Sequence, residues 1–275
     1  MDKPTMFEPY QAAADIDVVP AYFPILGFGI LPVNAFVLKA AEPVLVDAGL
    51  VPLSDEFMEK LCSLVDPGDL RWLWLTHADQ DHVGSLHRIL DMAPSLRVIT
   101  TYLAAGRLSL FHPLPMDRMY LLNPGQSISV GDRVLTATKP PSYDAAETTG
   151  FYDPKSAAFF CADCFGALMS KPVENAAEMG PEKLQEGLVT WATVDAPWLH
   201  IVDRVLFAKT LDRIREICPK LILSAHLPAA RDMTEELLGY LGTVPAAQPF
   251  VGPDQQALEA MLKRLTGKLH AGAIE

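Results

Sequence analysis

The feature that most constrains this 275-residue chain is a dense run of potential metal ligands directly after an apolar segment. The segment Arg71–Thr76 reads RWLWLT, which is typical of a buried strand, and HADQDHVG follows it at once. Imidazole and carboxylate side chains are good ligands for zinc, iron and manganese. On the turn that leaves the strand, His77 and Asp79 can face one side while Asp81 and His82 face another. Such a loop can therefore supply two ligands to each of two neighbouring cations.

A chance polar turn and a zinc-binding helix both fit this run less well. A solvated polar turn that contains histidines by chance would not be expected to follow an apolar strand and to open a helix at Gly84. The His-Glu-x-x-His zinc helix does not match either, because His77 and His82 are five residues apart and the loop between them is rich in aspartate.

The composition argues against several classes of protein. A net charge of −12 disfavours nucleic acid or an anionic membrane as the main partner. No apolar run approaches the roughly 20 residues that cross a bilayer, and MDKPTMFEPYQAAADID at the start lacks the apolar core of a secretory signal. We therefore expect a cytoplasmic protein that acts on a small molecule, with no nucleic-acid or membrane partner.

The rest of the chain alternates short apolar runs with amphipathic segments. Strands are predicted at Asn34–Lys39, Val44–Asp47, Arg97–Thr101, Gln126–Val130, Arg133–Thr138, Thr149–Tyr152, Ala157–Cys161 and Leu221–Ser224. Helices are predicted at Asp55–Val65, Gly84–Met92, Ala104–Leu110, Arg204–Ile217, Met233–Leu241 and Gln255–Leu265. Residues 171–200 show weak periodicity and are expected to form an irregular insertion. Because the strands occur in two batches with helices between them, a layered α/β sandwich is favoured over a regular βαβ alternation.

The ligand-rich run resembles a known signature. His77-x-Asp79-x-Asp81-His82 is similar to the His-x-[His/Glu/Asp]-x-Asp-His motif of the metallo-β-lactamase superfamily. Three more strings resemble landmarks of that superfamily and follow in the same order: VLVDAG at 44–49, FCADCFG at 160–166 and LSAH at 223–226. The resemblance spans residues 34–228, which is most of the chain.

The resemblance implies a fold and a domain organisation. Members have a four-layer αββα sandwich, so we expect one such domain over residues 1–275, with its core at 16–230 and C-terminal helices in 231–275. Two strings, DHVGSL at 81–86 and ADCFGA at 162–167, are most similar to the metal domain of flavodiiron-type proteins. That branch normally carries a flavodoxin domain after the metal domain, but this chain is too short for one and has no matching flavin-binding loop.

The resemblance also implies a ligand set for two divalent metal ions. The ligands carried over from the superfamily, together with one substitute discussed below, are His77, Asp79, Asp81, His82, Asp144, Asp163 and His226. Asp163 would be shared between the two metals. A set of three imidazoles and four carboxylates is rich in oxygen and favours iron, with zinc and manganese as alternatives.

One expected ligand is missing. Superfamily members normally have a third histidine before the bridging aspartate, whereas no histidine occurs between Leu135 and Asp163. Asp144 is the best-placed substitute, Glu147 is the second choice, and a position without a ligand is the third alternative. Asp47, at the end of the early strand, is expected to orient the ligand loop by hydrogen bonding.

Two functions follow from the resemblance. The first is a metal-dependent hydrolase, in which metal-bound water attacks an ester, a thioester or a lactone-like small molecule. Asp81 and Asp163 would then be the catalytic carboxylates, with Asp81 doubling as ligand and proton acceptor.

The second is a flavodiiron-like protein that binds or reduces dioxygen or nitric oxide, either as an oxidoreductase supplied with electrons by a partner or as an oxygen sensor. The hydrolase is favoured here because hydrolysis is the commonest activity of the superfamily and needs no electron donor. Many relatives form dimers, which leaves a homodimer open.

Overall fold

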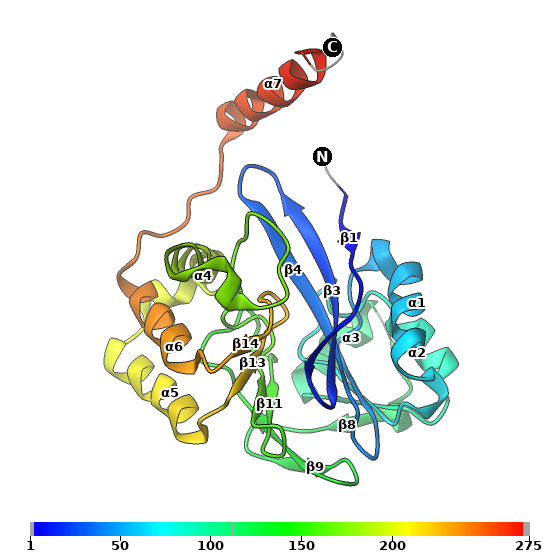
Figure 1. The fold of residues 1–275 in the computed structure, drawn as a ribbon. Coiled ribbons are helices and arrows are strands. Elements are labelled where there is room, and N and C mark those ends of the chain that lie inside the picture. Colours follow the sequence, from blue (N-terminus) through cyan, green and yellow to red (C-terminus); the bar gives the residue numbers. More distant parts are fainter. Residues whose placement is uncertain (1–2, 112, 272–275) are drawn as a thin grey trace.

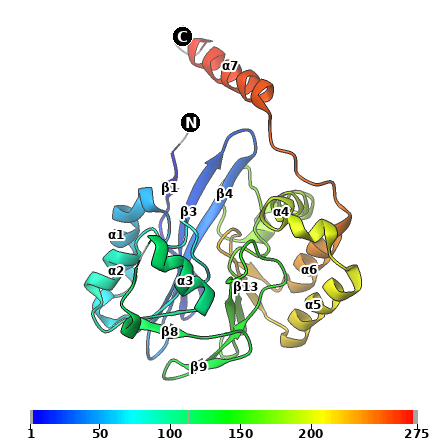
Figure 2. The ribbon, with the colours of Figure 1, turned by 180° about the vertical axis from the view of Figure 1, so that it is seen from behind.

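Two β-sheets face each other at the centre of the protein, and helices cover their outer faces (Figure 1). The structure is a computed structural model that describes residues 3–111 and 113–271, with side chains in the last helix described as far as Lys263. Figure 2 shows the same layers from behind, with α1, α2 and α3 on one side and α4, α5 and α6 on the other. The four-layer αββα sandwich expected from the sequence is therefore confirmed.

The first sheet has eight strands, all from the first half of the chain. They are β1 (Thr5–Met6), β2 (Tyr10–Ala13), β3 (Ile16–Ile25), β4 (Gly29–Leu38), β5 (Val44–Val46), β6 (Trp72–Trp74), β7 (Arg97–Thr100) and β8 (Met119–Leu121). The long strands β3 and β4 form an antiparallel hairpin, whereas β5, β6, β7 and β8 run parallel to one another. Apolar side chains of α1 (Ser54–Leu64), α2 (Leu86–Met92) and α3 (Tyr102–Phe111) pack against this sheet.

The second sheet has six strands, which lie between residues 127 and 231. They are β9 (Ser127–Ser129), β10 (Val134–Thr138), β11 (Gly150–Asp153), β12 (Ala158–Phe160), β13 (Leu221–Leu223) and β14 (Ala230–Arg231). Its outer face is covered by α4 (Pro181–Asp195), α5 (Arg204–Ile217) and α6 (Thr234–Thr243). Short 3-10 helices connect the elements: η1 (Val51–Leu53), η2 (Pro67–Asp69), η3 (Met116–Arg118), η4 (Ala176–Met179), η5 (Pro197–Ile201) and η6 (Val244–Ala246).

Helix α4 corrects the prediction of an irregular insertion at residues 171–200. Its buried face carries Leu184, Leu188 and Ala192 but also Gly187, which breaks the apolar pattern in the sequence. A Cβ at Gly187 would lie 2.2 Å from the carbonyl oxygen of Leu168, so the close approach of the two backbones requires a glycine there. The glycine that this close packing requires thus interrupts the apolar pattern of the buried face, which is why the sequence did not predict a helix here.

An apolar layer joins the two sheets. Trp74 of the first sheet packs on Phe151 of the second, with ring centroids 4.4 Å apart, and Phe36 meets Phe160 at 5.5 Å. All four side chains are almost completely buried. Burial of aromatic side chains of this size is a large favourable term in folding. This layer holds the two sheets in a fixed relative position. The loops at the ends of the sheets are therefore also held in place relative to one another.

The parallel strands bring four loops to one end of the sandwich. β5 and β6 are parallel neighbours in the first sheet, and β12 and β13 are parallel neighbours in the second. The carboxyl ends of parallel neighbours lie at the same edge of a sheet, where ligand sites are usually built. Asp47 follows β5, the run His77–His82 follows β6, Asp163 follows β12 and His226 follows β13.

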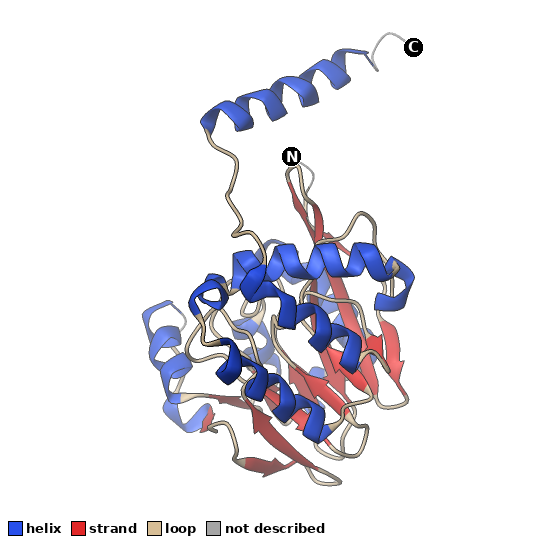
Figure 3. Ribbon diagram, turned by 90° about the vertical axis from the view of Figure 1, so that its left-hand side faces the viewer, coloured by secondary structure: helices blue, strands red, loops and turns tan. Residues whose placement is uncertain are grey.

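The last helix, α7 (Gln255–Ala271), stands apart from the four layers and is joined to α6 by an extended stretch (Figures 1 and 3). The assignment of the whole chain to one domain stays a prediction, because α7 lies outside the sandwich. Among the helices in the described part of the chain, none combines the length and hydropathy needed to cross a bilayer.

Candidate metal centre

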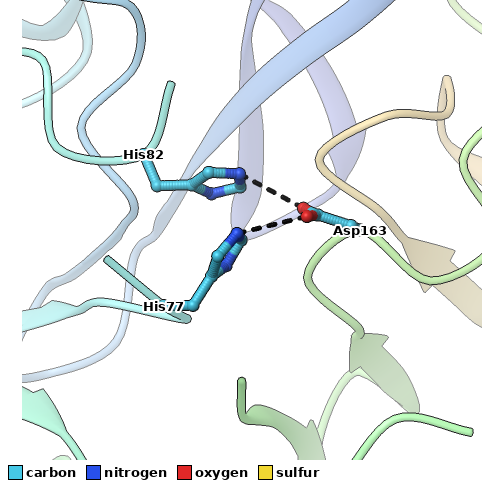
Figure 4. A group of neighbouring side chains, drawn as sticks. All are labelled: His77, His82 and Asp163. Atoms are coloured by element: carbon cyan, nitrogen blue, oxygen red, sulfur yellow. Dashed lines mark ion pairs between the residues drawn. The ribbon is translucent and has the colours of Figure 1, made fainter. Parts of the chain in front are cut away.

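A carboxylate from one sheet faces histidines from the other at the centre of the loop cluster. Figure 4 shows His77 and His82 pointing toward Asp163 across the gap between the sheets. Oδ2 of Asp163 lies 3.2 Å from Nε2 of His77, and Oδ1 lies 3.2 Å from Nε2 of His82 and 3.4 Å from Nε2 of His226. Oδ2 of Asp163 therefore faces His77, while Oδ1 faces His82 and His226. This is the arrangement that a carboxylate shared by two cations requires.

Asp47 orients both histidines of the loop. Its Oδ2 accepts a hydrogen bond from Nδ1 of His82 at 2.9 Å, and its carboxylate also accepts from the hydroxyl of Thr76. The Thr76 oxygen in turn lies 3.0 Å from Nδ1 of His77 and accepts its hydrogen. The network thus assigns the hydrogen of each imidazole to Nδ1 and leaves the lone pair of Nε2 directed into the centre. A role for Asp47 in orienting metal ligands stays a prediction, and these hydrogen bonds are the contacts through which it would act.

His226 is held in the same way by the backbone of the opposite sheet. Its Nδ1 donates to the carbonyl oxygen of Pro32 at 2.7 Å, and its Nε2 lies 3.5 Å from Oδ2 of Asp81. The ring packs edge-on against Trp191, with centroids 5.2 Å apart. A Cβ at Gly166 would lie 2.5 Å from Trp191 and 2.7 Å from Cβ of His226, so this packing depends on the absence of a side chain at Gly166.

Three buried atoms at the centre have no hydrogen-bond partner. They are Nε2 of His77, Nε2 of His82 and Oδ1 of Asp163. Buried polar atoms without partners are costly and uncommon in folded proteins. A cation placed among them would satisfy all three, and imidazole nitrogen with carboxylate oxygen is a common donor set for transition metals. The residues present therefore fit a bound metal ion.

The same side chains perturb one another's protonation when no metal is bound. Burial is the largest influence on the pKa of His77 and lowers it, but the carboxylates of Asp163 and then Asp144 together outweigh burial and raise the pKa to about 9. Burial likewise opposes the charge on His82, whose pKa is nevertheless raised by neighbouring carboxylates, Asp81 first. Burial raises the pKa of Asp163, while the surrounding histidines, His77 first, hold it well below its usual range. Protons thus fill the place that metal ions would take, and metal binding would release them.

All seven predicted ligands meet in three overlapping groups, in each of which the ligand atoms lie within 4.8 Å of one another. The groups are His77 with His82 and Asp163, Asp81 with His82 and His226, and His77 with Asp79 and Asp144. Because the groups share histidines, the donors are spread over two adjoining positions rather than one.

The structure separates the two candidates for the missing histidine. Oδ1 of Asp144 lies 3.9 Å from Nε2 of His77 and belongs to one of the three groups. The carboxylate of Glu147 is buried and points instead to the guanidinium of Arg107. The geometry therefore favours Asp144 over Glu147, and a ligand role for Asp144 stays a prediction.

Two charged residues beside the centre were not among the predicted site residues. Arg107 of α3 donates to Oδ1 of Asp79 at 3.0 Å as well as to Glu147, and nothing in the local sequence signals this contact. Asp195 ends α4, and burial first, then the charges of Asp163 and Asp144, raises its pKa to about 8. Its segment was expected to be irregular, so only the fold of α4 could reveal its position.

Relatives with curated names match part of their own length. A nitric oxide reductase from Moorella thermoacetica is 26% identical over 186 residues, which are 67% of this chain and 45% of the relative. An anaerobic nitric oxide reductase flavorubredoxin from Pectobacterium atrosepticum is 24% identical over 134 residues, which are 48% of this chain and 26% of the relative. The chain thus spans less than half the length of these proteins.

Solved structures of the same kind share the fold. A mutant of the flavo di-iron protein from Thermotoga maritima has a TM-score of 0.77 at 18% identity, covering 89% of this chain and 62% of that one. The rubredoxin oxygen:oxidoreductase of the anaerobe Desulfovibrio gigas has a TM-score of 0.73 at 15% identity, covering 86% and 61%. The fold is therefore the metallo-β-lactamase type found in the metal domain of flavodiiron proteins.

The expectation of a metal-dependent hydrolase is wrong. The two curated relatives described above are named as nitric oxide reductases and one of the two structures as an oxygen oxidoreductase, and none of these is a hydrolase. The error arose because hydrolysis was preferred as an activity that needs no electron donor. The carboxylate-rich donor set already pointed away from the usual zinc hydrolase.

One protein-family model, described as ODP family beta lactamase, matches residues 31–226. The match covers most of the chain and includes the loop His77–His82 together with Asp163 and His226. The dinuclear His/Asp site resembles the di-iron centre of flavodiiron proteins. This chain therefore belongs to the ODP family of β-lactamase-fold proteins, and its resemblance to the flavodiiron metal domain is confirmed.

Proposed function

We propose that this chain holds two iron ions and binds dioxygen or nitric oxide at them. The observation that carries the proposal is the trio of unpartnered buried atoms on His77, His82 and Asp163, which face one another across the two sheets. The names of the relatives, nitric oxide reductase and oxygen oxidoreductase, supply the class of small molecule.

The donor set supports iron as the metal. Three imidazoles and four carboxylates make a harder site than the sulfur- and nitrogen-rich sites that select zinc. Zinc and manganese would fit the same geometry, so the metal content of the purified protein must decide. When bound, a ferrous pair would supply the binding site and at most two electrons, one from each iron.

The protein side chains give the centre one closed side and one open side. The imidazoles of His77, His82 and His226 are at most 3% exposed, whereas Asp79 is 38% and Asp81 28% exposed. A small ligand would therefore reach the metals from the carboxylate side. The imidazoles, held by Asp47, Thr76 and the Pro32 carbonyl, would keep the metals in place.

Reduction of the ligand would need electrons from outside the centre. The curated relatives are at least twice as long as the part they share with this chain. We propose that a separate electron-transfer partner reduces the centre if the protein turns over, and that without such a partner it binds the ligand and acts as a sensor.

The test uses the full chain purified without oxygen and loaded with ferrous iron. We expect about two irons per chain and a change in the visible absorption spectrum when nitric oxide or dioxygen is added. His82→Ala should lose both the iron and the spectral response. Full iron loading with a spectrum that neither gas changes would contradict the proposal, as would a wild-type chain that retains no iron.

A further inference from the structure

The two metal positions differ in how their ligands are held. We call the position formed by Asp81, His82 and His226 the inner position, and the one formed by His77, Asp79 and Asp144 the outer position, with Asp163 shared. The inner position has two buried imidazoles, each anchored through Nδ1 to a carboxylate or a carbonyl. The outer position has one imidazole and two carboxylates that are 38% and 24% exposed.

A cation of the protein itself lies beside the outer position. The guanidinium of Arg107 donates to Oδ1 of Asp79 at 3.0 Å and to the carboxylate of Glu147. Glu147 is buried and needs this partner, because an unpaired buried carboxylate is costly. Arg107 is therefore held in place by Glu147 while its second nitrogen reaches the ligand Asp79.

The charges at the two positions are consequently unequal. At the outer position the guanidinium neutralises part of the charge of Asp79 and occupies one of its two oxygens. It also repels any second cation within a few ångströms, an interaction that is substantial in partly desolvated surroundings. Among the described residues, no ion pair with lysine or arginine occurs at Asp81, the carboxylate of the inner position.

We infer that Arg107 weakens the outer position, so that the two metal ions bind in order, the inner one first and the outer one as a weaker, exchangeable ion. This inference rests on the proposed dinuclear function. It assigns to Arg107 an electrostatic role toward the outer metal ion rather than a role in the reaction itself.

If Arg107 instead helped Asp79 to coordinate the metal, removing Arg107 would have the opposite effect on the affinity of the outer position. If Arg107 mainly orients Asp79 for coordination, its loss would weaken the outer position. If its charge dominates, its loss would strengthen that position. The affinity of the second metal ion therefore decides between the two.

The experiment is an oxygen-free calorimetric titration of the metal-free full chain with ferrous iron. In the wild type we expect two binding events, the second weaker than the first. Arg107→Gln should tighten the second event by roughly ten-fold or more and leave the first unchanged. Arg107→Lys, which keeps the charge, should behave like the wild type. Arg88→Gln is the matched control, because Arg88 has the same 46% exposure and pairs with Asp55, which is not among the ligands.

A second variant is needed because Arg107→Gln leaves the buried carboxylate of Glu147 without its charged partner. Arg107→Gln combined with Glu147→Gln removes that charge as well, and the second event should still be tighter than in the wild type. A wild-type chain with two irons whose second event is unchanged or weaker in both variants overturns this inference alone. A wild-type chain that binds no iron overturns the proposed function, and the inference with it.

Discussion

Two clusters of buried charge lie in this fold, and they are satisfied in different ways. In the first, Arg133 is 2% exposed and donates to Asp15 at 2.5 Å, to Asp153 at 2.9 Å and to Asp132 at 3.1 Å. Hydrogen bonds from Arg133 and then from Lys155 hold the pKa of Asp132 well below its usual range. This cluster contains its own cations.

The second cluster, around Asp163, contains no such cation at its core. Nε2 of His77, Nε2 of His82 and Oδ1 of Asp163 face one another without a hydrogen-bond partner. Both clusters have a buried centre and are rich in aspartate, so these two features alone do not distinguish them. What distinguishes a metal site from a structural ion cluster in this protein is that its core lacks the permanent positive charge of an arginine or a lysine. The variants described next test that distinction.

The largest effect is expected at the shared carboxylate. Asp163→Asn removes the negative charge that faces both positions, so bound metal should fall from about two ions to well below one ion per chain. Elemental analysis of protein purified without oxygen measures this. Asp132→Asn, in the Arg133 cluster, is the control and should keep its metal. Equal metal content in the two variants would contradict the assignment of the Asp163 cluster, and not the Arg133 cluster, as the metal site.

The next largest effect is expected on folding, in the other cluster. Arg133→Gln leaves the buried carboxylate of Asp153 unpaired and should cost about 3–5 kcal/mol in the free energy of unfolding. Arg215→Gln, which breaks an exposed ion pair with Glu235, should cost less than about 1 kcal/mol. Urea unfolding of the metal-free proteins measures both. Similar losses in the two variants would show that the Arg133 cluster is not a structural centre.

A smaller effect, on the affinity of the second metal ion, should show whether Asp144 or Glu147 is a ligand. Asp144→Asn removes a group that lies 3.9 Å from His77 and should weaken the second metal ion by roughly ten-fold. Glu147→Gln should change that affinity less, because Glu147 points to Arg107. Titration of the two variants with ferrous iron compares them directly. A larger loss in Glu147→Gln would reverse the assignment of the substitute ligand.

The smallest effect is a pH dependence that belongs to the metal-free centre. The folded pKa of His77 is raised from 6.5 to about 9, mainly by Asp163 acting against burial. A raised pKa means that the folded state holds the proton more tightly, so this stabilisation is complete below pH 6.5 and is lost as the pH rises through 9. Thermal unfolding of chelated protein should therefore show falling stability over this range. His77→Gln should reduce the fall but not abolish it, because the pKa of His82 is also raised. A flat wild-type profile would rule out protonation of His77 against Asp163.

The sequence predicted the parts of the centre that depend on local order. The four ligands from His77 to His82 lie within six residues after a strand, so they share one loop in any fold that forms the strand. Asp163 and His226 were assigned from the order of landmarks, and the structure brings both to the same loop cluster.

The parts that could not be predicted depend on contacts between distant segments. Arg107 lies on α3 and donates to Asp79 of the ligand loop and to Glu147, contacts that join segments 28 and 40 residues apart in the sequence. Nothing in the spacing of Asp144 and Glu147 distinguishes them, since both lie in a loop without regular periodicity.

The two sheets each supply part of the centre, with His77 and His82 on one and Asp163 and His226 on the other. A metal ion would therefore join the two halves of the sandwich directly. Metal–ligand distances tolerate shifts of only about 0.2 Å. Sliding of one sheet past the other would therefore break bonds between the metal and its ligands. The contact between Trp74 and Phe151, which helps to hold the two sheets together, therefore bears on the geometry of the metal ligands, although neither ring is a ligand.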